Sequence, residues 1–294
     1  MKTAYLFPGQ ASQFVGMGKT LYDAKPEARK LFEQANEILG FRISEVMFGG
    51  TEEELKQTNI TQPSVYLHSV ISFFTSENSL IPDAVAGHSL GEISALVAAG
   101  VLDFESGLKL VAARANAMQT ACENNPGTMA AIVGLEDEQI EKICSDIDDE
   151  IIIPANYNCP GQLVISGSLA GIQKAEQAMI QAGAKRFIVL AVGGAFHSPL
   201  MQEAQSLLAK AIEESQFQTP ICPIYQNVDA CPHTDPNEIK NLLLNQLTAP
   251  VKWTQIIQNM IADGIESFVE VGGNGTVLSG FMKRIDRSKS IVSI

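Results

Sequence analysis

The stretch "VAGHSLGEISALVAAG", residues 85–100, joins a short apolar run to a helix-like run through a tight turn. The turn reads GHSLG at residues 87–91, a G-x-S-x-G pattern between a predicted strand and a predicted helix, which is typical of a nucleophile elbow. The serine hydroxyl would stand at a helix N-terminus, where backbone N–H groups and the helix dipole favour developing negative charge. We therefore interpret Ser89 as a nucleophile; the alternative is an incidental serine in a glycine-rich turn.

Strands and helices alternate on both sides of this turn. Apolar runs between turn signals predict strands at residues 3–7, 83–87, 221–228 and 265–271. Helical periodicity predicts helices at residues 23–40, 62–74, 90–100, 104–121, 198–215 and 276–285. Such alternation predicts an α/β fold with one parallel sheet.

The pattern changes between residues 128 and 192, where the predicted order is β-α-β-β-α-β. This order is that of a ferredoxin-like unit. We therefore expect a main domain formed by residues 1–127 and 193–294, with a subdomain of residues 128–192 inserted into it.

Composition excludes several classes of function. A net charge of −13 and a pI of about 4.8 argue against general nucleic-acid binding. We find neither a signal peptide nor an apolar run of membrane-spanning length, and the five cysteines are scattered, so we expect a reduced, cytoplasmic protein. With four histidines and no H-E-x-x-H pattern, we expect no metal site.

A serine nucleophile needs a base, and four histidines compete for that role. His68 lies in an apolar helical run, which favours a packed core position. His88 adjoins the serine, so its side chain should point away along the turn. His233, in "CPHTDP", is typical of a solvated loop. His197, in "GGAFHSPLM", follows the strand that closes the insertion, and loops after strand ends are where such domains build their sites, so His197 is the predicted base.

The loop "FPGQASQ" follows the first predicted strand. Its residue Gln10 could supply one backbone N–H, and Leu90 a second, to an oxyanion hole facing Ser89.

Two other glycine-rich stretches do not fit a nucleotide site. "GMGKT" at residues 16–20 lacks the first glycine of a phosphate loop, and "EVGGNGTV" at residues 270–277 lacks the full dinucleotide fingerprint.

With these motifs in place, the whole chain resembles the malonyl-CoA:acyl carrier protein transacylases of fatty-acid and polyketide synthesis. The motifs that carry the resemblance run in order through the sequence: "FPGQASQ", "QPS", "GHSLGE", Arg114, "MAAIVGL", "NYNCPGQLVISG", "FHSPLM", "QNVDA", "QLTAPVKW" and "FVEVG". The family fold is an α/β-hydrolase-like domain with a ferredoxin-like insertion.

The resemblance implies a role for each matching residue. Ser89 would be the nucleophile and His197 its base, with the backbone carbonyl of Gln246 in place of the usual triad carboxylate. The backbone N–H groups of Gln10 and Leu90 would form the oxyanion hole. The implied reaction is malonyl transfer from malonyl-CoA to the phosphopantetheine thiol of acyl carrier protein through a malonyl-serine ester, with no cofactor beyond the phosphopantetheine that the partner carries.

Two further residues would set substrate choice. Arg114 would bind the free malonyl carboxylate, because a planar guanidinium can form two parallel hydrogen bonds with it. Phe196, in "AFH", resembles the malonyl-selective members, since its ring would occupy the space that an α-methyl group needs. Phe196 could equally be a core residue that closes the inserted subdomain.

The chain departs from the family at Gly272-Gly273-Asn274-Gly275, where members commonly have glycine-proline-glycine-lysine. Because the lysine is missing, the resemblance does not carry over a contact to CoA phosphate or carrier protein at that loop, whereas the catalytic assignment is unaffected. The densest basic stretch is "KRIDRSK" at residues 283–289, which could dock an acidic carrier protein or simply end a helix.

Other functions remain compatible with the same elbow. A serine thioesterase or esterase would deliver water instead of a thiol, and a stand-alone acyltransferase would load a polyketide synthase. A non-catalytic subunit that binds carrier protein would not need both Ser89 and His197. We expect a monomer without nucleic-acid or membrane partners.

Overall fold

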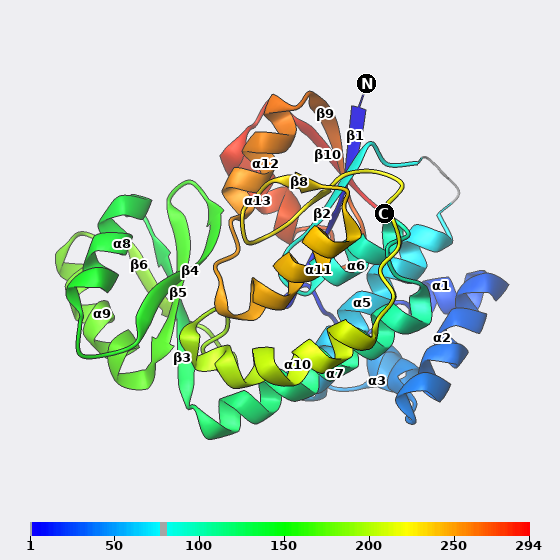
Figure 1. Ribbon diagram of the computed structural model, residues 1–294, viewed down its shortest axis with the longest axis horizontal. Coiled ribbons are helices and arrows are strands. Elements are labelled where there is room, and N and C mark those ends of the chain that lie inside the picture. The colour runs from blue at the N-terminus through cyan, green and yellow to red at the C-terminus, as the bar shows by residue number, and fades with distance from the viewer. Residues whose placement is uncertain (1, 77–80) are drawn as a thin grey trace.

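The computed structural model describes residues 2–76 and 81–294; Met1 and residues 77–80, which belong to the first predicted domain range, lie outside the described residues. The chain forms a six-stranded sheet in its main body and a four-stranded sheet at one side (Figure 1). The predicted α/β architecture is confirmed.

The six-stranded sheet has the order β10-β9-β1-β2-β7-β8. Its strands in that order are β10 (Ser290–Ser293), β9 (Ile265–Glu270), β1 (Lys2–Phe7), β2 (Ala84–Gly87), β7 (Ile224–Tyr225) and β8 (Pro232–His233). Neighbouring strands from β10 to β7 pair in parallel, whereas β8 pairs antiparallel with β7. A short turn through Ala230, whose φ is 65°, reverses the chain between β7 and β8.

The predicted strand at residues 221–228 is therefore shortened to β7, and the assignment of His233 to a solvated loop is wrong. His233 lies on β8 with 16% of its side chain exposed, and its ring nitrogens contact Asp229 and Glu238 at 2.8 and 3.3 Å. The antiparallel pairing with β7 places the histidine against these carboxylates.

Helices cover both faces of this sheet, and the alternation of side chains along β1 explains how. Ala4 and Leu6 belong to the apolar cluster under α12 and α13, whereas Tyr5 and Phe7 belong to the larger cluster formed with α5, α6 and α7. Both layers are visible in Figure 1. The helices of the main body are α1 (Lys19–Ala24), α2 (Pro26–Leu39), α3 (Ile43–Gly49), α4 (Glu52–Lys56), α5 (Thr58–Phe74), α6 (Gly91–Ala98), α7 (Phe104–Asn124), η1 (Pro199–Met201), α10 (Gln202–Glu214), α11 (Pro236–Asn245), η2 (Gln246–Thr248), α12 (Trp253–Ala262) and α13 (Val277–Ile285).

The single helix predicted at residues 23–40 is two helices. α1 ends at Ala24, and Lys25 is extended with φ −123° and ψ 114°. A residue before proline avoids helical backbone angles, while proline itself fits the first position of a helix. Pro26 therefore ends α1 and begins α2.

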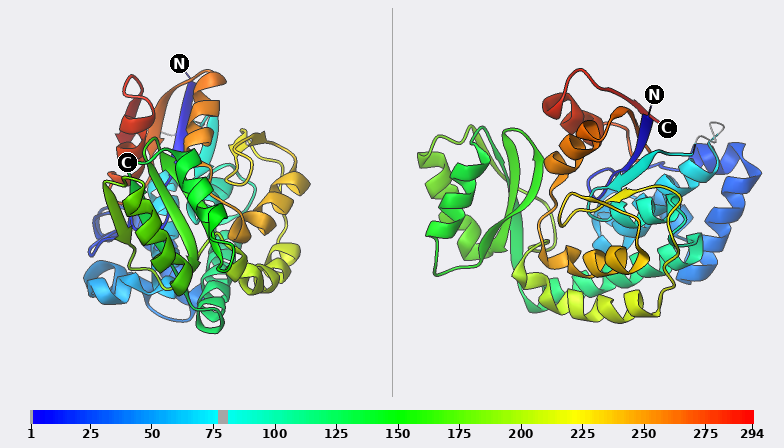
Figure 2. Two further views of the ribbon diagram at one scale, coloured as in Figure 1. Left: turned by 90° about the vertical axis from the view of Figure 1, so that its left-hand side faces the viewer. Right: turned by 45° about the horizontal axis from the view of Figure 1, so that its top comes forward.

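The four-stranded sheet has the order β4-β5-β3-β6, with every pairing antiparallel. Its elements are β3 (Gly127–Val133), α8 (Asp137–Asp146), β4 (Ile152–Cys159), β5 (Gln162–Ser168), α9 (Leu169–Gln181) and β6 (Arg186–Val189). This chain order and strand order are those of a ferredoxin-like unit. α8 and α9 cover one face, and the unit projects from the main body to the left in Figure 1 and in the right-hand view of Figure 2.

Strand β4 also forms backbone hydrogen bonds with Val251 in the main body. The backbone N–H of Val251 donates to the carbonyl of Ala155 at 2.8 Å, and the N–H of Tyr157 donates to the carbonyl of Val251 at 2.9 Å. The four-stranded unit is thus tied to the segment that follows η2.

Among the residues that the structure describes, none of the helices combines the length and the apolar character that crossing a bilayer requires.

Candidate active site

The turn between β2 and α6 holds Ser89 in a conformation that few side chains adopt. Its φ is 53°, in the left-handed region. The two flanking glycines are required by close packing: a Cβ on Gly87 would lie 1.9 Å from the Gly91 carbonyl carbon, and one on Gly91 would lie 2.1 Å from the Phe7 carbonyl oxygen. The crowding of β1, β2 and α6 therefore fixes where the serine is presented.

Ser89 meets His197, which lies 108 positions further along the chain. Their Oγ and Nε2 atoms are 2.7 Å apart. His197 follows β6 in a turn closed by Ser198, whose hydroxyl donates to the Ala195 carbonyl at 2.6 Å, and it too has a left-handed φ of 57°. The two residues therefore come from strained turns that face each other.

Two carbonyl groups orient the imidazole. Nδ1 of His197 lies 3.0 Å from the Gln246 oxygen and 3.2 Å from the Ala249 oxygen. A carbonyl oxygen only accepts hydrogen bonds, so Nδ1 carries the proton and Nε2 presents its lone pair to the Ser89 hydroxyl. Burial, reinforced by the positive charge of Arg114, lowers the pKa of His197 to about 3, and the ring is neutral at neutral pH.

Arg114, on α7, is 1% exposed and approaches the same serine. Its Nη2 donates to Ser89 Oγ at 3.0 Å and to Gln246 Oε1 at 3.1 Å, while Nη1 donates to Gln62 Oε1 at 2.8 Å. Among the described residues, Nε has no hydrogen-bond acceptor. Burial lowers the pKa of Arg114 to about 10, which leaves the guanidinium charged at neutral pH. The site therefore contains a buried cation with one N–H group still able to donate a hydrogen bond.

Gln246 links these three groups. Its carbonyl accepts from His197, its side-chain oxygen accepts from Arg114, and its Nε2 donates to the Ser89 carbonyl at 3.0 Å. The residue begins η2 and is 1% exposed.

A cavity of about 230 Å³ opens beside Ser89 and His197. Gln10, Leu90 and Phe196 line it together with the apolar side chains of Met118 and Met129. Phe196 is 6% exposed. The sequence-predicted residues thus gather at one place, either in direct contact with Ser89 or on the wall of this cavity.

The loop that carries Gln10 packs closely on the elbow, and Gly9 allows the approach. A Cβ at Gly9 would lie 2.4 Å from the His88 carbonyl oxygen. Within the described part of the chain, neither the Gln10 N–H nor the Leu90 N–H is bonded to a protein acceptor. Both groups are therefore available to a ligand oxygen.

The remaining histidines near the site have other partners. His88 Nε2 lies 2.8 Å from Asn158 Oδ1, and its ring packs on Trp253. His68 accepts a hydrogen bond at Nδ1 from the Gly273 N–H at 2.9 Å. Over residues 2–76 and 81–294, no cluster of three histidine, cysteine or acidic side chains could hold a metal ion.

Sequence reasoning missed three residues of the site: Gln62, Glu92 and Asn227. Asn227 accepts from the Ser89 N–H at 2.7 Å, and Glu92 accepts from the Asn227 N–H at 2.7 Å. All three lie inside the motifs "QPS", "GHSLGE" and "QNVDA", so the signal was present but their partners were not apparent from sequence spacing.

Comparison with known proteins agrees with this geometry. Residues 4–291 match the family model described as acyl transferase domain. The malonyl CoA-acyl carrier protein transacylase of Bacillus subtilis (strain 168) is 40% identical over 297 residues, covering 100% of this chain and 93% of that protein.

Two solved structures extend the likeness to three dimensions. An acyl carrier protein S-malonyltransferase from Vibrio cholerae superposes with a TM-score of 0.95 at 41% identity, covering 100% of this chain and 97% of the other. A malonyl-transacylase in complex with a type II polyketide synthase acyl-carrier protein superposes with a TM-score of 0.96 at 37% identity, covering 100% and 96%.

Proposed function

This chain belongs to the acyl transferase domain family, and on that premise we propose that it transfers a malonyl group from malonyl-CoA to the phosphopantetheine thiol of acyl carrier protein. One observation carries the choice of acyl group: the buried Arg114 guanidinium lies 3.0 Å from the Ser89 hydroxyl. A cation beside the nucleophile suits an acyl group that ends in a carboxylate.

The first half-reaction acylates Ser89. Nε2 of His197 accepts the hydroxyl proton as Oγ attacks the thioester carbonyl of malonyl-CoA. The tetrahedral intermediate collapses by breaking the carbon–sulfur bond, and the proton on Nε2 passes to the departing CoA thiolate. A malonyl ester remains on Ser89.

The second half-reaction reverses these roles with a different thiol. Nε2 takes the proton of the phosphopantetheine thiol as its sulfur attacks the ester carbonyl. The carbon–oxygen bond then breaks, and His197 returns the proton to Ser89 Oγ. The Nδ1 hydrogen bonds to Gln246 and Ala249 keep the ring in the tautomer that both steps need.

In both steps negative charge develops on the carbonyl oxygen of the acyl group. Gln10 and Leu90 line the cavity, and Leu90 is the N-cap of α6. Their N–H groups and the helix dipole would stabilise that charge. Phe196, on the same cavity wall, would exclude an α-methyl branch.

We also propose that the chain is divided into two parts. The main domain comprises residues 1–127 and 193–294, and residues 128–192 form an inserted subdomain. The inserted subdomain contributes Met129 and Val164 to the cavity wall. We place the protein in the cytoplasm as a monomer that binds neither nucleic acid nor membrane.

The competing proposal is a thioesterase or esterase with the same serine and histidine. Product analysis separates the two: incubation with malonyl-CoA and holo carrier protein should yield malonyl carrier protein and free CoA. Release of free malonate at the same rate with and without the carrier protein would identify a hydrolase instead.

A further inference from the structure

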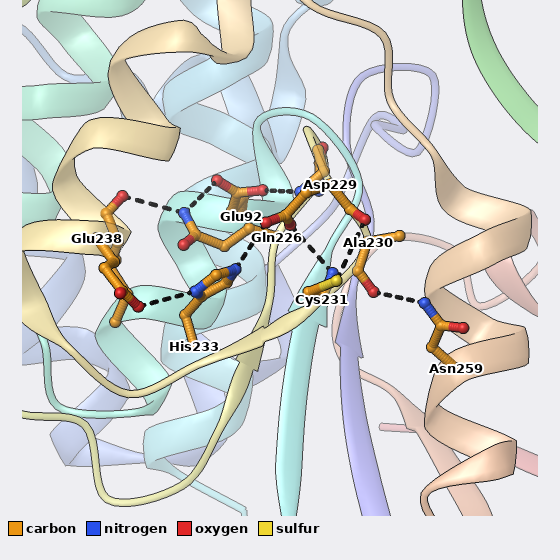
Figure 3. Close-up of polar contacts among 10 residues, drawn as sticks. Glu92, Gln226, Asp229, Ala230, Cys231, His233, Glu238 and Asn259 are labelled. Atoms are coloured by element: carbon orange, nitrogen blue, oxygen red, sulfur yellow. Dashed lines mark hydrogen bonds and ion pairs between the residues drawn. The ribbon is translucent and has the colours of Figure 1, made fainter.

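The turn that follows β7 packs directly behind the nucleophile elbow. Its first two residues, Gln226 and Asn227, are fully buried, as is Glu92 in the first turn of α6. Figure 3 shows the side chain of Gln226 directed at the Glu92 carboxylate, with the turn through Asp229 and Ala230 beside it. None of these side chains enters the proposed chemistry, so their burial needs another explanation.

The Asn227 side chain bridges the elbow. Its Nδ2 donates to the Gly87 carbonyl at 2.7 Å, and its Oδ1 accepts from the Ser89 N–H at 2.7 Å. One amide thus holds the backbone on both sides of His88. Because Ser89 has a left-handed φ, these two hydrogen bonds oppose relaxation of the turn toward a less strained conformation.

Glu92 in turn fixes Asn227. One carboxylate oxygen accepts from the Asn227 N–H at 2.7 Å, and the other accepts from Gln226 Nε2 at 3.2 Å. Two donors converge on the two oxygens, which a carboxylate satisfies and a glutamine cannot, since its NH2 group would face a donor.

The buried carboxylate is costly to keep. Burial raises the pKa of Glu92 to about 7, against the opposing effect of the Asn227 hydrogen bond. Titratable groups with strongly shifted pKa values cluster at functional sites, and the backbone N–H of Glu92 donates to the Ser89 carbonyl at 3.0 Å.

We propose that Asn227 and Glu92 are positioning residues that hold the elbow in the conformation from which Ser89 Oγ reaches His197. Asn227 clamps the backbone of the turn, and Glu92 anchors Asn227 to the start of α6. This inference rests on the proposed function of Ser89 as the nucleophile.

Single-turnover acylation of Ser89 by malonyl-CoA tests the inference. Asn227→Ala should lower the acylation rate constant per folded site by a factor on the order of 10², the cost of misplacing a reacting group. Glu92→Gln should lower the rate constant by roughly tenfold, because the Glu92 side chain acts on the elbow only through Asn227. The dissociation constant of malonyl-CoA should change by less than about threefold in Asn227→Ala, which keeps both Arg114 and Glu92. The charge of Glu92 acts on Arg114, so in Glu92→Gln the acylation rate constant is measured at saturating malonyl-CoA.

Asn259→Ala is the matched control. Asn259 lies on α12, and its Nδ2 donates to the Ala230 carbonyl at 3.0 Å (Figure 3). The change therefore removes a side-chain amide that contacts the same turn but not the elbow. We expect its rate constant to stay within about twofold of the wild type. Inactivation by phenylmethanesulfonyl fluoride, which needs Ser89 but not Arg114, should slow in parallel with malonyl loading in the two elbow variants.

The outcomes separate the inference from the function it rests on. If Asn227→Ala and Glu92→Gln match Asn259→Ala per folded site and differ only in melting temperature, the two residues are structural and the inference is wrong. If Asn227→Ala does not fold, Glu92→Gln decides alone. If the wild type itself forms no malonyl-Ser89, the proposed function fails instead.

Discussion

Arg114 Nη2 donates a hydrogen bond to Ser89 Oγ across 3.0 Å. The group proposed to select the acyl chain is therefore in direct contact with the group proposed to attack it. A malonyl carboxylate is separated from its thioester carbonyl by a single methylene, so one acyl group can reach both residues at once. We infer that substrate choice and the attack by Ser89 depend on the same contact.

Replacing Arg114 with alanine should abolish the preference for malonyl-CoA over acetyl-CoA. The change removes a charge-assisted pair and leaves a cavity where the carboxylate would bind. Arg114→Lys keeps a charge but loses the planar fork, and it should recover only part of the malonyl rate. Competition between malonyl-CoA and acetyl-CoA measures the effect; a retained malonyl preference in Arg114→Ala would place the carboxylate at another residue.

Phe196→Ser should relax the exclusion of methylmalonyl-CoA. The phenyl ring lines the cavity beside His197, and its removal opens space for an α-methyl group. We expect the ratio of methylmalonyl to malonyl transfer to rise while malonyl transfer itself persists. Kinetics with both thioesters check this, and an unchanged ratio would assign Phe196 to the core alone.

His197 should make folding stability depend on pH. Its pKa is about 3 in the folded chain against 6.5 ordinarily. As pH falls below 6.5, the unfolded chain binds a proton that the folded chain refuses, so the folded state loses stability down to about pH 3. Between pH 7.5 and pH 5, wild type should lose about 2 kcal/mol more than His197→Gln in urea unfolding.

His68 and Glu92 have shifted pKa values in both proteins, so their contributions cancel in the comparison. His88, whose pKa burial also lowers, acts on His197 and is replaced by glutamine in both proteins as a second comparison. Parallel pH dependence of wild type and His197→Gln would mean that His197 has an ordinary pKa in the folded chain. In that event burial and Arg114 would not keep the imidazole neutral below pH 6.5, and the pKa shift assigned to His197 would be wrong.

The basic end of α13 has two interpretations, a docking site for an acidic carrier protein or a solvated helix end, and charge reversal separates them. Arg284 Nη1 donates to Gln162 Oε1 at 3.3 Å, and Gln162 lines the cavity, so this helix end borders the route to Ser89. Changing Lys283 and Arg284 to glutamate should raise KM for an acidic carrier protein but not for malonyl-CoA. The exposed Lys30 on α2 and Lys210 on α10, both changed to glutamate, are the control for net charge. Equal effects on both substrates would exclude docking at α13.

Features set by local sequence could be predicted. The elbow rests on neighbouring residues, because glycines on either side of Ser89 are needed wherever a strand turns sharply into a helix. The β-α-β-β-α-β order followed from periodicity alone. The break at Pro26 was equally local, and attention to the residue before proline would have divided the helix predicted at residues 23–40.

Features set by tertiary packing could not be predicted. Asn227 lies 138 positions from Ser89, and its contact depends on β7 pairing with β2 and then ending after two residues. Gln62 and Arg114 are 52 positions apart on different helices. Chain folding, not spacing, brings these partners together.

Intact-mass analysis after brief exposure to malonyl-CoA, without carrier protein, tests the central claim most directly. Wild type should gain one malonyl group, mapped by peptide analysis to Ser89. Ser89→Ala should gain none, and His197→Ala should load more slowly by a factor on the order of 10² to 10⁴. Loading of Ser89→Ala, or a malonyl group mapped to any other residue, would contradict the account.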